Sequence, residues 1–180
     1  MAKAPALEAG NRGFESSHPD QFFMIDDVAT KFLRESNAIE GVFDEGALKQ
    51  ALYAWLYIIG EEKLTTGAVL KTHKILMLNQ PLTPDLRGYF RRFGVRIGAR
   101  YGKPWKRVPE LMAQWVENNK GKKTEEEIKQ LHIDYEMIHP FADGNGRTGR
   151  IFMNWLRLKN GFDILVIKES EKSKYYKWFQ

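Results

Sequence analysis

The side chains best suited to chemistry lie in one stretch, which reads HPFADGNGRTGR from His139 to Arg150. An imidazole such as that of His139 has a reference pKa of about 6.5 and can accept a proton from a hydroxyl near neutral pH. Asp143 stands just before the glycines, where a single carboxylate together with phosphate oxygens suffices to hold Mg²⁺. The stretch therefore predicts a site where a general base meets a phosphate-bearing ligand.

The glycines and arginines of this stretch suit an anion. One helix is expected to end just before Pro140, and a second to begin within residues 144–146. The unpaired N–H groups and the positive dipole end of a helix N-terminus attract phosphate, and glycines let it approach the backbone. Arg147 and Arg150 are three residues apart, so we expect them to share a helix face and hold phosphate oxygens.

Helices must position these residues, and the spacing of apolar side chains predicts helices on both sides of the stretch. A capping box of Thr124 and Glu127 precedes the helix that runs into His139. The other helices are expected to begin near Asp26, after Asp44, at Thr65 or Thr66, near Pro109, within residues 144–146 and at Lys172. The fold class is therefore mostly α.

One β-hairpin is predicted where the helical pattern fails. Phe93, Val95 and Ile97 alternate with polar residues and glycines, which is typical of a short strand, and residues 98–104 supply turn residues. A second short strand is expected from Ile164 to Ile167. The whole pattern predicts a helical bundle that carries a short hairpin.

Length and composition limit the class of protein. A chain of 180 residues suits one domain, and we expect a loose N-terminal tail over residues 1–20 and a single domain over residues 21–180. The sequence holds no cysteine, no apolar run long enough for a membrane span and no secretory signal. We therefore expect a cytoplasmic protein without disulfides.

Basic residues are concentrated between residues 87 and 107, where no acidic residue occurs. With a net charge of +5, the chain would suit nucleic acid or an anionic small ligand. One alternative function is therefore nucleic-acid binding by this segment and its aromatic residues. The competing interpretation is a solvated rim that attracts ATP, and we regard nucleic acid as the less favoured partner.

A metal centre is a further alternative. Glu136 and His139 have the ExxH spacing of di-iron helical bundles, which need a second such pair on another helix. The other ExxH, Glu15 to His18, falls in the predicted tail. We therefore interpret His73 and His132 as packed or hydrogen-bonded histidines.

The stretch HPFADGNGRTGR resembles the complete Fic family signature, HPFx[DE]GNGRxxR, and the preceding LHIDYEMIHPF is similar to that family's helix. The resemblance extends from about Ser36 to the C-terminal helix and includes Arg87, Gly88, Tyr89 and Arg91. It implies a Fic-type bundle that transfers AMP from ATP, with Mg²⁺, to a Ser, Thr or Tyr hydroxyl of a target protein. The intact GNGR disfavours the phosphate-transferring Doc branch.

The resemblance also implies a role for each residue of the signature. His139 would deprotonate the target hydroxyl, and Asp143 would hold magnesium on the α- and β-phosphates. Phe141 would anchor the loop in the core. The residues implied to form the anion hole and to steady the phosphate chain are Gly144, Asn145, Gly146, Arg147 and Arg150.

Two further segments resemble parts of that family. The hairpin with Phe93, Val95 and Ile97 is similar to the flap that positions a target segment by strand addition, a mode that leaves the target's side chains loosely specified. Ser36 to Gly41, SNAIEG, resembles the inhibitory motif [ST]xxxE[GN], on a helix expected around residues 26–40. Glu40 would then pair with Arg150 and block the productive pose of the γ-phosphate.

The resemblance leaves the direction of the reaction open. In relatives with the inhibitory glutamate, that carboxylate can position a hydrolytic water, so Glu40 is also a candidate base for removal of AMP. The target protein is not specified by the sequence, and association into a homo-oligomer stays open.

Overall fold

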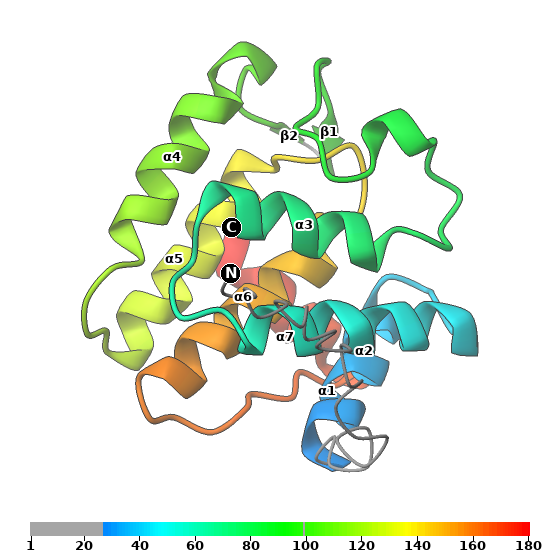
Figure 1. The fold of residues 1–180 in the computed structure, drawn as a ribbon, viewed down its shortest axis with the longest axis vertical. Coiled ribbons are helices and arrows are strands. Elements are labelled where there is room, and N and C mark those ends of the chain that lie inside the picture. The colour runs from blue at the N-terminus through cyan, green and yellow to red at the C-terminus, as the bar shows by residue number, and fades with distance from the viewer. Residues whose placement is uncertain (1–26, 99) are drawn as a thin grey trace, which may run out of the picture.

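The computed structural model describes residues 27–98 and 100–180, which fold mainly into α-helices (Figure 1). The predicted tail over residues 1–20, the helix start at Asp26 and the pair Glu15 and His18 lie outside these residues. In chain order the α-helices are α1 (Asp27–Ile39), α2 (Glu45–Ile59), α3 (Thr66–Leu76), α4 (Val108–Asn118), α5 (Glu125–Ile138), α6 (Asn145–Lys159) and α7 (Lys172–Tyr176). Short 3-10 helices cover Pro84–Leu86, Trp105–Arg107, Glu169–Glu171 and Lys177–Phe179.

The predicted helix starts are confirmed by their caps. The side chain of Asp44 accepts a hydrogen bond of 2.7 Å from the amide of Ala47, and that of Thr65 accepts one of 3.0 Å from Ala68. The capping box of Thr124 and Glu127 is complete, with both reciprocal hydrogen bonds present. Each bond satisfies an amide that the first turn of a helix leaves unpaired, so these short polar patterns determine where α2, α3 and α5 begin.

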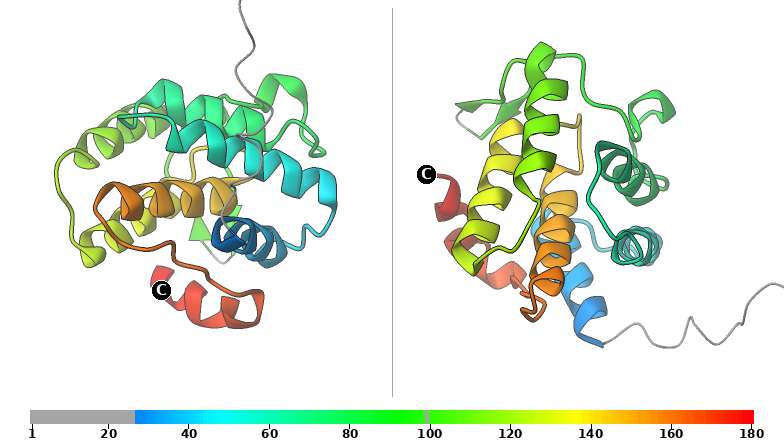
Figure 2. Two further views of the ribbon diagram at one scale, coloured as in Figure 1. Left: turned by 60° about the horizontal axis from the view of Figure 1, so that its bottom comes forward. Right: turned by 60° about the vertical axis from the view of Figure 1, so that its left-hand side comes forward.

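Helix α6 runs through the middle of the bundle. Figure 2 shows α2 and α3 on one side of α6 and the C-terminal helices on the other. Every residue from Arg147 to Leu156 is buried, as expected of a helix enclosed on all sides. The stretch from His139 to Arg150 therefore leads into the most enclosed helix of the fold.

None of the helices among the described residues has both the length and the apolar character that crossing a membrane requires.

The hairpin is present but shorter than predicted. Strand β1 (Arg96–Ile97) pairs antiparallel with β2 (Arg100–Tyr101). Phe93 and Val95 lie before β1, and β2 falls inside the segment predicted as a turn. The carbonyl of Phe93 accepts a 2.7 Å hydrogen bond from the guanidinium of Arg91, so it is taken out of strand pairing.

The strand predicted from Ile164 to Ile167 is wrong, because this segment forms no strand in the structure. The amide and carbonyl of Leu165 bond instead to the side chain of Asn154 on α6, at 2.7 and 3.1 Å. One buried amide side chain thus satisfies the backbone that a partner strand would otherwise pair with. The apolar side chains of the segment still pack on the core.

Arg91 joins the hairpin to the end of α5. Its side chain is buried, and its guanidinium donates to the carbonyls of His139 at 2.7 Å and Ile138 at 3.3 Å. It also donates to the carbonyls of Phe93 and Lys103, on the two sides of the hairpin. One side chain therefore fixes the hairpin relative to the residue that begins the functional stretch.

We predict that Arg91→Ala lowers the free energy of unfolding by about 2–4 kcal/mol, because it leaves several backbone carbonyls without their charged donor. Urea denaturation measures this change. Arg92→Ala is the matched control, since the neighbouring Arg92 is exposed, and it should change stability by less than about 0.5 kcal/mol. Equal effects of the two substitutions would contradict the role assigned to Arg91.

Candidate active site

The loop between α5 and α6 is held by its own residues. His139 ends α5 in the left-handed conformation, with φ of 51°, and it alone among the described non-glycine residues has a positive φ. Such a conformation is strained for a residue with a β-carbon, so the surroundings must enforce it. Pro140 follows directly, and the side chain of Asn145 bonds both the amide and the carbonyl of Phe141, at 2.8 and 3.0 Å.

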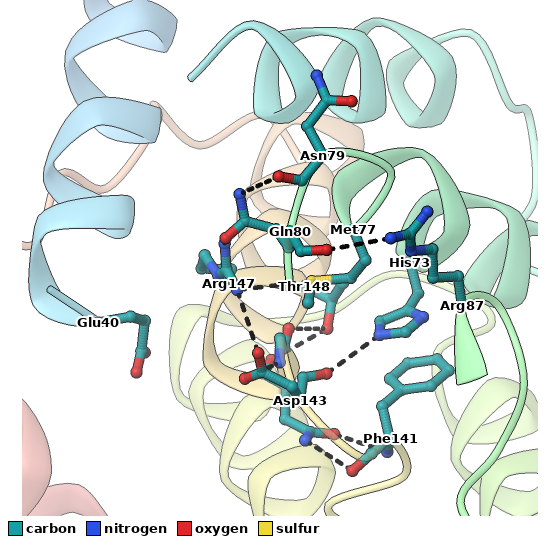
Figure 3. A network of polar contacts seen from close by, with 12 residues as sticks. Glu40, His73, Met77, Asn79, Gln80, Arg87, Phe141, Asp143, Arg147 and Thr148 are labelled. Carbon is teal, nitrogen blue, oxygen red and sulfur yellow. Dashed lines mark hydrogen bonds and ion pairs between the residues drawn. The ribbon is translucent and has the colours of Figure 1, made fainter. Parts of the chain in front are cut away.

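Phe141 anchors the loop in the core, as the family resemblance implied. Its ring is buried and stacks on the imidazole of His73, with 3.7 Å between ring centroids. His73 accepts a hydrogen bond from the amide of Gly88 at Nδ1, and its Nε2 then donates to the carbonyl of Asp143 at 3.0 Å (Figure 3). Burial lowers the pKa of His73 to about 4, so it is neutral and structural.

A pocket of about 550 Å³ opens beside this loop. Its lining brings together His139 from the end of α5, Gly146 and Arg150 from α6, Glu40 from the end of α1 and Ile97 from the hairpin. The C-terminal residues Tyr175, Tyr176, Phe179 and Gln180 close one side of it. Phe93, Val95, Asp143 and Arg147 do not line the pocket.

Arg147 and Arg150 are both buried, but they bind different partners. Arg147 donates to Oε1 of Gln80 at 3.0 Å and lies 3.8 Å from the carboxylate of Asp143 (Figure 3). The carboxylate of Asp143 is itself 57% exposed. Arg147 is thus engaged beside the end of α3, whereas Arg150 extends toward α1. That both arginines hold phosphate oxygens stays a prediction.

Arg150 is 1% exposed and binds residues from two other helices. It donates to the hydroxyl and the carbonyl of Ser36, each at 2.9 Å, and to Oε1 of Glu40 at 2.7 Å. A further bond of 3.3 Å reaches the hydroxyl of Tyr175 on α7. Burial alone would lower the pKa of Arg150, but Tyr175 and Glu40 raise it above its ordinary value. The contact predicted between Glu40 and Arg150 is thus present.

The carboxylate of Glu40 also lies against the first turn of α6. A β-carbon placed on Gly146 would collide with Oε1 of Glu40. This turn has no side-chain cap, and its first amides carry the positive end of the helix dipole. Glu40 therefore places a negative charge at the position where the sequence predicted a bound anion.

His139 lines the pocket as a neutral imidazole. Its pKa is lowered to about 4, chiefly by burial, and Arg91 and Arg100 lower it further. The backbone carbonyl of Glu136, which can accept from the ring, opposes this shift without reversing it. At neutral pH the ring can therefore accept a proton without first losing one.

Three contributors to the site were missed by the sequence analysis: Tyr175, Gln80 and Glu136. Tyr175 joins Arg150 to His132, with 2.8 Å between its hydroxyl and Nε2 of His132. Contacts between residues so far apart in the chain cannot be predicted from a local sequence pattern. Glu136 was considered only as a metal ligand, and no cluster of three or more His, Asp or Glu side chains suited to a metal occurs within residues 27–98 and 100–180.

Fold and site together define a helical domain whose central helix begins beside a histidine and has no side-chain cap on its first turn. The model of the Fic/DOC family matches residues 63–157, more than half of the sequence. The chain belongs to the Fic/DOC family.

Relatives with assigned names support this membership. A probable protein adenylyltransferase of Aquifex aeolicus is 32% identical over 132 residues, which are 71% of this chain and 35% of that protein. The protein adenylyltransferase Fic of Drosophila erecta is 30% identical over 158 residues, which are 83% of this chain and 30% of that protein. The chain thus spans about a third of the length of these curated relatives.

Solved structures share the fold. A Fic domain containing signaling protein from Bacteroides thetaiotaomicron superposes with a TM-score of 0.72 at 22% identity, covering 84% of this chain and 71% of that chain. A fragment of Fic-1 from C. elegans gives a TM-score of 0.72 at 19% identity, covering 91% of this chain and 58% of that chain. These likenesses confirm the predicted Fic-type helical architecture.

We predict that His139 stays uncharged down to about pH 5, because its folded-state pKa is about 4. An unfolded histidine has a pKa of about 6.5, so protonation favours the unfolded chain. The contribution of His139 to stability is therefore lost as the pH falls from about 6.5 toward 4. NMR of the imidazole nitrogens measures this site alone, and a midpoint near 6.5 would contradict the burial argument.

Proposed function

We propose that this chain transfers AMP from ATP to a hydroxyl side chain of a target protein and that Glu40 restrains the reaction. The observation that carries the proposal is that one pocket brings together a neutral imidazole, the uncapped start of α6 and a buried arginine. The names of the relatives, protein adenylyltransferases, agree with it.

His139 acts as the general base in this proposal. Its neutral ring takes the proton of the target hydroxyl, whose oxygen attacks the α-phosphorus of ATP. The bond from the α-phosphorus to the bridging oxygen breaks, and pyrophosphate leaves with that electron pair. A positioned base of this kind contributes about 10²- to 10⁴-fold to a rate.

The residues that follow His139 receive the phosphates. The amides of Asn145 and Gly146 lie at the uncapped start of α6, and Arg150 offers charged donors. The amide of Gly144, the third residue of this turn, donates to Oδ1 of Asp143 at 2.6 Å when no nucleotide is bound. Arg147, whose guanidinium donates to Gln80, contributes positive charge from outside the pocket. Each of these groups favours negative charge as it develops on the leaving pyrophosphate.

Asp143 is the residue that would hold Mg²⁺. Its exposed carboxylate and the absence of a wider acidic cluster among the described residues fit a cation that takes most of its remaining ligands from phosphate and water. When bound, the ion would neutralise charge on the phosphate chain.

The hairpin is the proposed docking edge for the target. Ile97 on β1 lines the pocket, so a target strand paired with this short sheet would pass the mouth of the site. Phe93 and Val95, which precede β1, would support the docked segment from outside the pocket.

Glu40 is the proposed restraint, with Ser36 holding Arg150 in place beside it. The carboxylate of Glu40 neutralises Arg150 and covers Gly146, so a γ-phosphate at Arg150 must displace it. In the ATP-bound state with Glu40 in place, repulsion would turn the phosphate chain away from the pose needed for attack.

Removal of AMP from a modified target is the second candidate function. It is favoured by one observation: Glu40 lines the same pocket as His139 and is 34% exposed, so its carboxylate is accessible to water. Release of AMP from a modified target, lost in Glu40→Gln, would assign this activity. Nucleic-acid binding by residues 87–107 is less favoured, since Arg91 is buried and Arg87 donates to the carbonyl of Gln80.

We predict that Glu40→Gly raises the initial rate of AMP transfer by about 100-fold, which corresponds to about 2.7 kcal/mol. Incorporation of label from α-labelled ATP into protein measures the rate. Glu62→Gly, which removes an exposed carboxylate outside the pocket, is the control and should leave the rate unchanged. An unaltered rate in Glu40→Gly would overturn the restraint.

His139→Ala in the Glu40→Gly background should abolish transfer while ATP still binds, because the substitution removes the proton acceptor and leaves the phosphate-binding groups in place. Calorimetry reports binding and labelled ATP reports transfer. If transfer persists in the double variant, His139 is not the general base.

A further inference from the structure

Glu136 lines the pocket although nothing in the proposed reaction uses it. The residue lies on α5, one helical turn before His139, and is 8% exposed. Its Oε1 atom is buried and has no hydrogen-bond partner within the described part of the chain. Buried polar atoms are nearly always paired, so an unpaired carboxyl oxygen at a pocket wall indicates a ligand that completes it.

The carboxyl group lies against α6 beside Arg150. A β-carbon on Gly149 would collide with Oε1 of Glu136, so the absence of a side chain at Gly149 makes room for this carboxyl. Arg150 follows Gly149 directly and lines the same pocket. An oxygen atom bound by Arg150 would therefore be presented to the wall that Glu136 forms.

Glu136 carries a proton in this environment. The pKa of Glu136 is raised to about 8, chiefly by burial; Arg150 and Arg100 oppose this shift, and Glu40 adds to it. On α7, Tyr175 and Tyr176 face it as neutral phenols, because burial raises the pKa of both. On α5 itself, burial keeps His132 and His139 neutral by lowering the pKa of each.

We propose that Glu136 is a further nucleotide-binding residue, whose protonated carboxyl group donates a hydrogen bond to a phosphate oxygen held by Arg150. The inference rests on the proposed function, since it requires a nucleotide in this pocket. A neutral carboxyl group can donate to an anion, whereas a carboxylate in the same place would repel it.

Nucleotide binding would then be coupled to proton uptake. In Glu40→Gly the nearby negative charge is gone, so the pKa of Glu136 in the empty site falls and more of the carboxyl is ionised at pH 8. A phosphate that enters beside Arg150 restores a negative charge, raises the pKa again and draws a proton from solution. The bound phosphate thus raises the pKa of Glu136, as the carboxylate of Glu40 does in the unliganded chain.

Calorimetric titration of Glu40→Gly with Mg-ADP at pH 8, in two buffers of different ionisation enthalpy, tests the inference. The terminal phosphate of ADP is already ionised at this pH. We expect uptake approaching about one proton per ADP bound. Adenosine, which lacks phosphate, should bind without uptake.

The matched control is Glu40→Gly combined with Glu136→Gln, whose amide still donates a hydrogen bond but cannot ionise. It should bind Mg-ADP without proton uptake, and its affinity should not change from pH 7 to pH 9, whereas the affinity of Glu40→Gly should fall. No uptake by Glu40→Gly, or equal uptake by both proteins, would overturn the inference. Failure of both to bind ADP would contradict the proposed function as well.

Discussion

A guanidinium group that is 1% exposed must be neutralised by its surroundings, and Arg150 imposes this requirement on the whole bundle. Arginine does not lose its proton in proteins, so burial cannot relieve the charge by deprotonation. Glu40 supplies the counter-charge here, and Ser36 and Tyr175 accept further hydrogen bonds; the three come from the first and last parts of the described chain. The central helix, the N-terminal helix and the C-terminal helix are thus joined at one charge.

The same charge explains how a restraint and a substrate site can share one pocket. Glu40 supplies an anion to Arg150 and to the first turn of α6, and a phosphate group would supply another. Because both neutralise the same buried group, each can replace the other without leaving Arg150 unpaired. The change in state is then a competition between two anions, and its equilibrium depends on their difference in affinity.

Local patterns in the sequence were sufficient to predict the helix starts at Asp44, Thr65 and Thr124, because a cap is decided by residues three apart. The loop from His139 to Arg150 was also predictable as one unit, since its residue types are consecutive. Hairpin length was not, because the side chain of Arg91 binds the carbonyl of Phe93, and only tertiary packing turns this guanidinium inward. The different partners of Arg147 and Arg150 and the unpaired carboxyl of Glu136 likewise follow from tertiary packing.

The central claim is that Glu40 and a phosphate group compete for Arg150. A comparison of nucleotide affinities tests this claim most directly. Dissociation constants for ATP and AMP should be measured in the wild-type chain and in Glu40→Gly. Competition predicts that Glu40→Gly binds ATP at least about tenfold more tightly, or about 1.4 kcal/mol, with little change for AMP. Equal changes for both nucleotides, or no change for ATP, would contradict the account.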